Sequence, residues 1–171
     1  MELSEKTTAY IDKLIARYPQ KRSALLMVLY AIQEEKGYVA DESHPWIAER
    51  LEIEPIQVYE VVTFYPMFLR EPPAKRQIRV CRTLSCALAG CYKTREILEK
   101  ELGIDAETER SADGEFQIEF VECLANCHIA PAVQVDETDY AIVTPDTAEA
   151  FAQKLREEAG LPTTAAAASA E

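Results

Sequence analysis

The residues of this chain best suited to chemistry are its five cysteines, which fall into two groups. The first group, C-RTLS-C-ALAG-C, places thiols at Cys81, Cys86 and Cys91, and the second, C-LAN-C, places them at Cys123 and Cys127. Thiolates bind soft metals, and four of them complete the coordination of one zinc ion or one iron-sulfur cluster. The sequence therefore predicts one four-thiolate site with one cysteine left over.

The spacing of the cysteines discriminates among metals. Structural zinc sites prefer C-x2-C pairs, and a thioredoxin-type redox disulfide also needs a C-x2-C pair at the start of a helix. The pairs here are C-x4-C and C-x3-C. These wider loops favour a [2Fe-2S] cluster, in which each of two irons takes two thiolates, and leave a zinc site as the alternative.

The N-terminal residues MELSEKTTAY carry mixed charge and lack an apolar core, so they indicate neither a secretory signal nor a transit peptide. We therefore expect a cytoplasmic protein or a mature organellar one. Reducing compartments disfavour disulfides, which strengthens the case for metal ligation. The longest apolar runs, residues 24–32 and 58–68, are shorter than the roughly 20 residues of a membrane-spanning helix, so we expect no direct membrane insertion.

The charge of the chain is acidic and unevenly spread. A net charge of -12 disfavours nucleic acid as a partner, because phosphate binding needs a basic face. Residues 70–82 are the exception, with basic side chains that lead into Cys81. This basic segment is either a solvated linker or a contact for a protein partner or a negatively charged cofactor. Arg79 and Arg82 accordingly face solvent or bind acidic groups of a partner, or at least one of them lies near the metal site or its partner.

Residues 1–69 are predicted to form an N-terminal helical bundle. Apolar residues repeat at helical spacing within residues 11–18, and a second helix is expected to end at Gly37, which can adopt the left-handed cap. Two further helices are expected, one with Ser43 as its N-cap and one that begins near Pro55.

The pattern changes after this bundle. Prolines and basic residues in REPPAKR indicate a linker over residues 70–76. Residues 77–160 then alternate strands and helices in the order β-α-β-β-α, which predicts a thioredoxin-like α/β domain. The predicted strands are QIRVC, EFQIEFVEC, PAVQVD and YAIVT, and the predicted helices are GCYKTREILEKELGI and PDTAEAFAQKLREEAG. Residues 161–171 are low in complexity and predicted to be disordered. The fold class is thus α+β, a helical bundle followed by an α/β domain.

Both cysteine pairs lie where a predicted strand ends. Cys81 closes QIRVC and Cys123 closes FQIEFVEC, while Cys86 and Cys127 lie in the loops that follow. If the two strands are neighbours, both loops leave the sheet at the same edge and the four thiols converge there.

Cys91 is the predicted spare thiol. If a helix begins near Ala87, Cys91 shares one helical stripe with Leu88, Leu98 and Leu102 and points into the domain core. A buried cysteine commonly packs as a small hydrophobic residue.

The positions of the two histidines argue against a mixed Cys/His site. His128 follows Cys127 directly, but a Rieske site needs two histidines, and the other one, His44, lies in the helical part. We therefore expect His128 beside the ligands or on the surface.

Three stretches carry a resemblance to a known family. They are VVTFYPMFLREPPAKRQIRVC, C-RTLS-C-ALAG and SADGEFQIEFVECLANCHIAPAVQV, and the helical stretches RYPQKRSALLMVLYAIQEEKGYV and IAERLEIEPIQVYEVVTFY are similar as well. Over about residues 10–158 the chain resembles the thioredoxin-like 2Fe-2S ferredoxin family, which includes the small 2Fe-2S (E) component of NADH:quinone oxidoreductase (complex I). The resemblance implies that Cys81, Cys86, Cys123 and Cys127 ligate one [2Fe-2S] cluster.

The resemblance also singles out three other positions. Pro131 takes the place of the cis-proline of the thioredoxin-like domain. Ala125 stands where the family commonly has glycine, so a positive φ there would strain the loop. Cys91 stands where the family usually has another residue, in agreement with its expected role in packing.

The chain contains no G-x-G-x-x-G motif or P-loop, so we expect a one-electron relay without a complete active site of its own. The resemblance implies a component of an enzyme, in the NADH-oxidising module of respiratory complex I. There its cluster would exchange single electrons with the FMN of a partner flavoprotein that also binds NADH. In a bacterium it would lie among other peripheral-arm subunits on the cytoplasmic face of the inner membrane. An NAD-linked hydrogenase or a formate dehydrogenase is the alternative assembly, and a zinc-stabilised adaptor without redox function is the remaining one.

Overall fold

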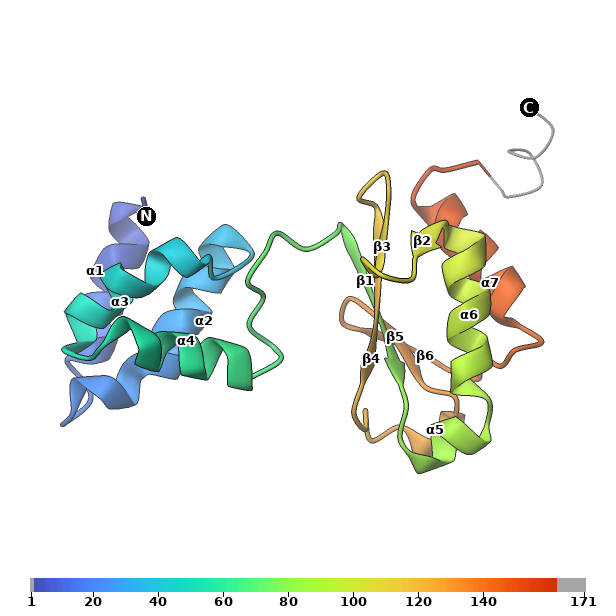
Figure 1. The fold of residues 1–171 in the computed structure, drawn as a ribbon, viewed down its shortest axis with the longest axis horizontal. Helices are drawn as coiled ribbons and strands as arrows, with labels where there is room; N and C mark the ends of the chain where they lie inside the picture. Colours follow the sequence, from blue (N-terminus) through green and yellow to red (C-terminus); the bar gives the residue numbers. More distant parts are fainter. Residues whose placement is uncertain (1, 163–171) are drawn as a thin grey trace. The chain divides into compact units, whose positions relative to one another are not determined.

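The computed structural model describes residues 2–162. The chain divides into two compact units, Met1–Pro73 and Ala74–Glu171, as Figure 1 shows. The boundary falls within residues 70–76, the predicted linker. Most of the tail predicted to be disordered, residues 163–171, lies outside the described part of the chain.

The first unit is helical, as predicted. It contains α1 (Glu5–Ile15), α2 (Leu25–Lys36), α3 (His44–Leu51) and α4 (Pro55–Phe64), with short 3-10 turns at Lys21–Ala24 and Asp41–Ser43. Its core is built from apolar side chains of all four helices, among them Ile11, Leu29, Ile32, Ile47 and Val58. None of the helices in residues 2–162 is long and apolar enough to cross a membrane.

The helix ends follow local sequence with one exception. Gly37 takes the left-handed conformation (φ 82°) that ends α2, and Pro55 begins α4, as expected. Ser43 is the N-cap residue of α3, as predicted, but its side chain makes no capping bond, because its hydroxyl donates to the carbonyl of Ala40 at 2.6 Å. The turn that precedes α3 gives Ser43 a helical backbone, whereas a capping residue needs an extended one.

The second unit is built on a six-stranded sheet with the strand order β2-β3-β4-β1-β5-β6. The strands are β1 (Arg76–Cys81), β2 (Ile104–Asp105), β3 (Arg110–Ser111), β4 (Phe116–Val121), β5 (Val133–Val135) and β6 (Thr138–Tyr140). The central strands β1 and β4 are parallel, and the other pairs are antiparallel.

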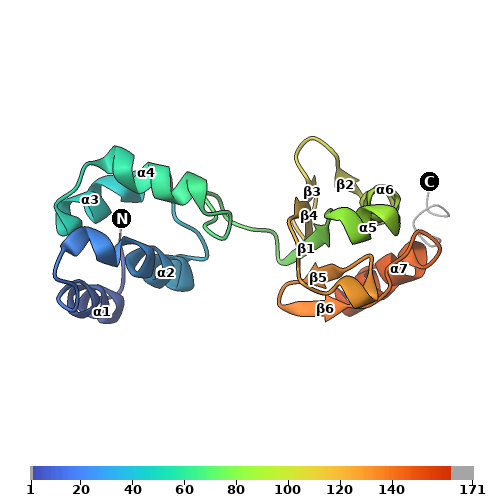
Figure 2. The ribbon, with the colours of Figure 1, turned by 90° about the horizontal axis from the view of Figure 1, so that it is seen from below.

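Two helices cover one face of this sheet. They are α6 (Cys91–Leu102) and α7 (Ala148–Glu158), and Figures 1 and 2 show both on the same side. Ile78 and Val80 of β1 are buried in the core with Leu98 of α6 and Leu155 of α7. The short helix α5 (Leu84–Leu88) lies after the end of β1.

The strand predictions differ from the structure in three places. Strands β2 and β3 have two residues each, too few to show the alternation on which the prediction relied. The predicted strand YAIVT is displaced, because β6 ends at Tyr140 and Ile142 takes a left-handed conformation (φ 54°) that breaks the extended chain. Strand β4 ends at Val121, two residues before Cys123.

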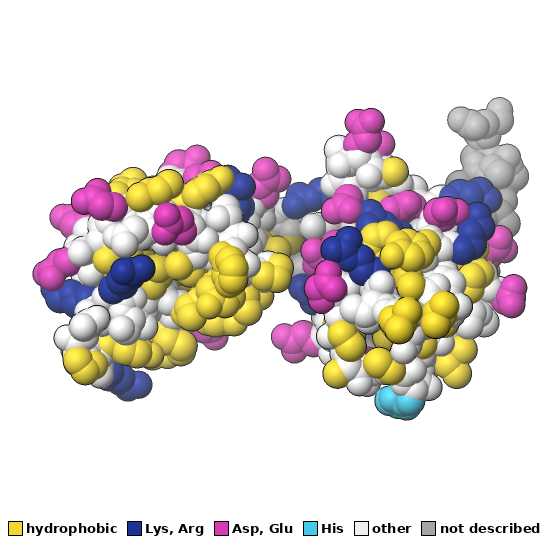
Figure 3. Space-filling model, turned by 60° about the horizontal axis from the view of Figure 1, so that its bottom comes forward, with side chains coloured by type: hydrophobic (Ala, Val, Ile, Leu, Met, Phe, Trp, Pro, Cys, Tyr) yellow, Lys and Arg dark blue, Asp and Glu magenta, His cyan; other side chains and the backbone are white. Residues whose placement is uncertain are grey.

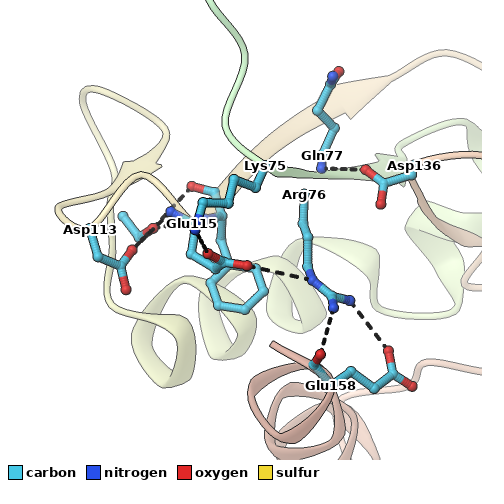
Figure 4. A network of polar contacts seen from close by, with 9 residues as sticks. Lys75, Arg76, Gln77, Asp113, Glu115, Asp136 and Glu158 are labelled. Atoms are coloured by element: carbon cyan, nitrogen blue, oxygen red, sulfur yellow. Dashed lines mark hydrogen bonds and ion pairs between the residues drawn. The ribbon is translucent and has the colours of Figure 1, made fainter. Parts of the chain in front are cut away.

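The basic residues of the segment 70–82 are paired with carboxylates of the chain. Lys75 lies 2.8 Å from Glu115, and Figure 4 shows this pair together with Arg76 between Glu115 and Glu158. Three further pairs complete the segment: Arg70 with Asp41, Arg79 with Glu119, and Arg82 with Glu122. Arg79 and Arg82 therefore meet acidic groups of their own domain, a placement that was not among those expected for them.

Candidate metal centre

The two cysteine loops leave the sheet at the same end. Strands β1 and β4 are parallel neighbours, and the last residue of β1, Cys81, lies opposite the last residue of β4, Val121. The backbone N–H of Arg82 still bonds to the carbonyl of Val121 at 3.1 Å. The neighbour relation on which the predicted convergence depended is therefore present.

Cys81 and Cys86 lie together inside the domain. Each is 1% exposed. The Cys81 sulfur lies 3.2 Å from the hydroxyl of Thr83, and the backbone N–H of Ala132 donates to the Cys86 sulfur at 3.5 Å. The carbonyl of Ala132 in turn accepts the N–H of Cys81 at 3.1 Å, so the residue before β5 contacts both cysteines.

The surroundings of these two thiols shift their pKa values in opposite directions. Burial works to raise the pKa of Cys81, but hydrogen bonds from the Thr83 hydroxyl and the Leu124 backbone outweigh it and lower the pKa. Burial raises the pKa of Cys86, with the Ala132 N–H in partial opposition. The thiolate is the form that binds metal, so the hydrogen bonds to the Cys81 sulfur favour the form that a ligand would need.

Cys123 and Cys127 are exposed on the loop that follows β4. The N–H of Ala125 donates to the Cys123 sulfur at 3.3 Å, and the N–H of Leu124 bonds to the Cys81 sulfur. The second contact joins the loop of β4 to the end of β1. Within residues 2–162, no three Cys, His, Asp or Glu side chains are grouped closely enough to hold a metal ion. The structure thus brings Cys81 and Cys86 together and places the other two on the adjoining loop.

The groups at this end of the sheet fit an iron-sulfur cluster. The predicted ligands are all thiols, and backbone N–H groups of Leu124, Ala125 and Ala132 point at three of the sulfur atoms. A cluster held by four thiolates is anionic, and N–H donors to its sulfur atoms offset that charge. A zinc site of the usual kind would show the tighter C-x2-C loops that this chain lacks.

Cys91 is fully buried, as predicted, but the helix around it differs from expectation. Gly90 adopts a left-handed conformation (φ 94°), which interrupts the helix and makes α5 and α6 separate, and a Cβ added there would meet Pro145 at 3.1 Å. Cys91 begins α6 and shares its buried face with Leu98. Leu88, predicted on the same stripe, belongs to α5 and is 81% exposed.

The other single-residue predictions are confirmed. The Ala130–Pro131 peptide bond is cis, and Ala125 has the positive φ (60°) that its place in the cysteine loop suggested. His128 is exposed, which agrees with a surface position.

The conformation of Ala125 leads to a stability prediction. An L-residue in the left-handed region costs about 1–2 kcal/mol, which glycine avoids. Glycine also makes the unfolded chain more flexible, and this lowers the free energy of unfolding by about 0.4–1 kcal/mol. Ala125→Gly is therefore expected to raise the free energy of unfolding by about 0.5–1 kcal/mol in urea denaturation. Ala130→Gly, at a residue with φ -60°, is the control and should lower it. A less stable Ala125→Gly protein would contradict the assigned strain.

Sequence reasoning missed the groups that contact the sulfur atoms. The hydroxyl of Thr83 and the N–H groups of Leu124 and Ala132 all reach a cysteine. Only Thr83 left a signal in the sequence, as a hydroxyl residue within the C-x4-C loop. Backbone donors are present in nearly every residue, so their direction is visible only in the folded loop.

Comparison with known proteins identifies the family of the chain. A model of the family described as thioredoxin-like [2Fe-2S] ferredoxin matches residues 11–156. The E component of NADH-quinone oxidoreductase from Aquifex aeolicus is 40% identical over 139 residues, which cover 81% of this chain and 86% of that protein. NADH-quinone oxidoreductase subunit 2 of Thermus thermophilus is 35% identical over 150 residues, 86% of this chain and 82% of that protein.

One further relative and one structural match are hydrogenase proteins. NADP-reducing hydrogenase subunit HndA of Solidesulfovibrio fructosivorans is 35% identical over 135 residues, 79% of this chain and 78% of that protein. Among solved structures, an NAD+-reducing [NiFe]-hydrogenase in the H2-reduced state matches with a TM-score of 0.64 and 20% identity. The match covers 81% of this chain and 22% of that longer one, and at this identity it shows the fold alone.

The family match spans most of the chain, and relatives of 35–40% identity cover most of its length. The family is one of ferredoxins with a [2Fe-2S] cluster, which confirms the predicted cofactor, and the named relatives are subunits of oxidoreductases. The chain belongs to the thioredoxin-like [2Fe-2S] ferredoxin family.

Proposed function

We propose that this chain is the electron-transfer subunit of the NADH-oxidising module of a respiratory NADH:quinone oxidoreductase. Its [2Fe-2S] cluster would be bound by Cys81, Cys86, Cys123 and Cys127. The observation that carries the proposal is the parallel register of β1 and β4, which sends both cysteine loops to one end of the sheet. The relatives named as the E component of NADH-quinone oxidoreductase support the assembly.

When bound, the cluster supplies a centre that takes up and gives away one electron at a time. The residues of this chain determine how that centre is exposed. Cys81 and Cys86 are buried, whereas Cys123 and Cys127 are exposed, so one side of the site faces the protein core and the other faces outward. The N–H groups of Leu124, Ala125 and Ala132 offset negative charge at the sulfur atoms, and the outward side is where a partner approaches.

Exposed apolar side chains gather at the same end of the domain. Leu84 and Leu88, 75% and 81% exposed, lie four residues apart on α5, and Cys86 of the same helix is buried. Ile142 is 58% exposed, and its N–H bonds to the carbonyl of Ile129 near Cys127. Figure 3 shows hydrophobic side chains over the end of the second unit at which α5 lies. We name Leu84, Leu88 and Ile142 the apolar collar.

The apolar collar suits a protein partner better than water. Contiguous apolar surface beside a polar site is typical of protein contacts, and the core of an interface is depleted of charged residues. The partner in this proposal is a flavoprotein that binds NADH and FMN, because the chain has no nucleotide-binding motif of its own. Such a complex would lie on the cytoplasmic face of the inner membrane as part of the peripheral arm.

A hydrogenase is the second candidate assembly. It is favoured by the 35% identity to a subunit of an NADP-reducing hydrogenase, close to the identity to several complex I subunits. The site on this chain would work in the same way in both assemblies, beside the same kind of flavoprotein. Neighbouring genes for quinone-reductase membrane subunits are expected under the first proposal, and genes for a hydrogenase under the second.

Metal analysis with electron paramagnetic resonance (EPR) tests the proposal. The isolated protein is expected to contain about two irons and two sulfides per chain and to give the signal of one unpaired electron after reduction with dithionite. A protein that holds one zinc ion and stays EPR-silent after reduction would contradict the relay and favour the zinc-stabilised adaptor.

A further inference from the structure

A row of polar side chains crosses the sheet on the face opposite to α6 and α7. Ile78 and Val80 of β1 are buried in the core beneath the helices, so Arg79 between them points to the other face. In the register of the sheet, Arg79 lies opposite Glu119 of β4 on one side and Gln134 of β5 on the other.

Each neighbour in this row is hydrogen-bonded to the next. Arg79 Nε lies 3.2 Å from Glu119 Oε1, and Arg79 Nη1 donates to Gln134 Oε1 at 3.3 Å. Gln134 Nε2 then donates to Asp139 Oδ1 of β6 at 2.9 Å. Because the oxygen of the Gln134 amide accepts from Arg79, the amide nitrogen is the group that donates to Asp139. We call Glu119, Arg79, Gln134 and Asp139 the polar row.

The polar row ends at the exposed cysteine loop. The second carboxylate oxygen of Asp139 accepts a hydrogen bond from Asn126 Nδ2 at 2.6 Å. Asn126 lies between Cys123 and Cys127, both of which are exposed. A hydrogen bond to a charged acceptor is stronger than a neutral one, so this contact ties the loop to the edge strand β6.

We propose that Asp139 is a positioning residue for the cluster and acts through Asn126 on the loop that carries Cys123 and Cys127. The inference rests on the proposed ligand set. Groups that hydrogen-bond behind a metal ligand orient it, and their loss typically costs roughly 10–100-fold in metal affinity or activity. Here the polar row connects the loop to the central strands of the sheet, which gives the carboxylate of Asp139 a fixed place from which to hold it.

Exchanging the side chains of Asn126 and Asp139 separates the effect of their hydrogen bonds from the effect of net charge. Asn126→Asp sets two carboxylates against each other, and they repel. Asp139→Asn leaves a single acceptor oxygen for the two donors of Asn126 and Gln134, so one bond is lost. In the double variant, the amide of residue 139 accepts from Gln134 with its oxygen and donates with its nitrogen to the carboxylate of residue 126. The double variant restores both bonds and has the net charge of the original chain.

The experiment measures loss of iron from the cluster-loaded protein to a chelator, together with the reduction potential. Each single variant is expected to release iron about tenfold faster, at the lower end of the usual range because the contact is exposed. The double variant is expected to return to within about twofold of the original rate and to the original potential. Glu137→Gln is the control, since it removes one exposed carboxylate from the same β5–β6 turn, and should leave both quantities unchanged.

The outcomes distinguish the inference from the function on which it rests. Single variants that release iron at the original rate, or a double variant that shows the sum of both single effects, would overturn the positioning role. An original chain that holds no cluster would overturn the proposed function itself.

Discussion

Replacing Cys86 by alanine is expected to abolish the [2Fe-2S] EPR signal or to change it severely, whereas replacing Cys91 by alanine leaves it intact. Both thiols are buried in the same core, so burial does not separate them. Cys86 lies on the short helix α5 that follows β1, and not in a loop as predicted, and its sulfur accepts the N–H of Ala132. Cys91 begins α6 and packs with Leu98 in the hydrophobic core.

The measurement is iron content with the integrated EPR signal of the reduced protein. Cys86→Ala should lose most of its iron, because three thiolates leave one iron incompletely coordinated. Cys91→Ala should keep the iron and lose only about 1 kcal/mol of stability, the cost of a small cavity in the core. A full signal from Cys86→Ala, or its loss from Cys91→Ala, would contradict the proposed ligand set.

Around the cysteines, local sequence patterns predicted the end of one strand and the burial of one side chain correctly. The end of β1 at Cys81 followed from apolar alternation and turn residues, which are local properties of the chain. Likewise, the burial of Cys91 followed from helical spacing with Leu98 and Leu102, since that face of α6 remains continuous. The α+β fold class rested on such patterns as well, and it is confirmed.

Other features depend on conformation or on register and left no pattern in the sequence. The helix break at Gly90 follows from a left-handed backbone beside Pro145, so Leu88 was placed on the wrong stripe. The polar row requires Arg79 to face Gln134 across two strands separated by more than fifty residues, a pairing set by the sheet as a whole. Sequence spacing therefore located the candidate ligands but not the groups that hold them in place.

Charged substitutions in the apolar collar are expected to have a second large effect, on the binding of the partner. Leu84→Glu combined with Leu88→Glu is expected to weaken binding to the flavoprotein by at least about a hundredfold, without loss of the cluster. Truncation of a central interface side chain typically costs more than about 1 kcal/mol, and an unpaired charge in its place adds a desolvation cost. Two such changes exceed about 2.7 kcal/mol, which corresponds to roughly a hundredfold change in Kd. Both side chains are exposed and Cys86 points the other way, so the fold and the buried thiols remain as they are.

Two ways of reducing the cluster then distinguish docking from damage to the site. With the double Leu variant, reduction by NADH through the flavoprotein should fail at protein concentrations that suffice for the original chain, while reduction by dithionite still gives the full EPR signal. Lys154→Glu on α7 is the matched control, because it changes the net charge by the same amount and lies on an exposed position away from α5. Unchanged NADH-driven reduction in the Leu variant would show that the partner approaches elsewhere. A loss in both variants would mean that charge, and not the apolar collar, governs the encounter, because only long-range electrostatics is shared by the two substitutions.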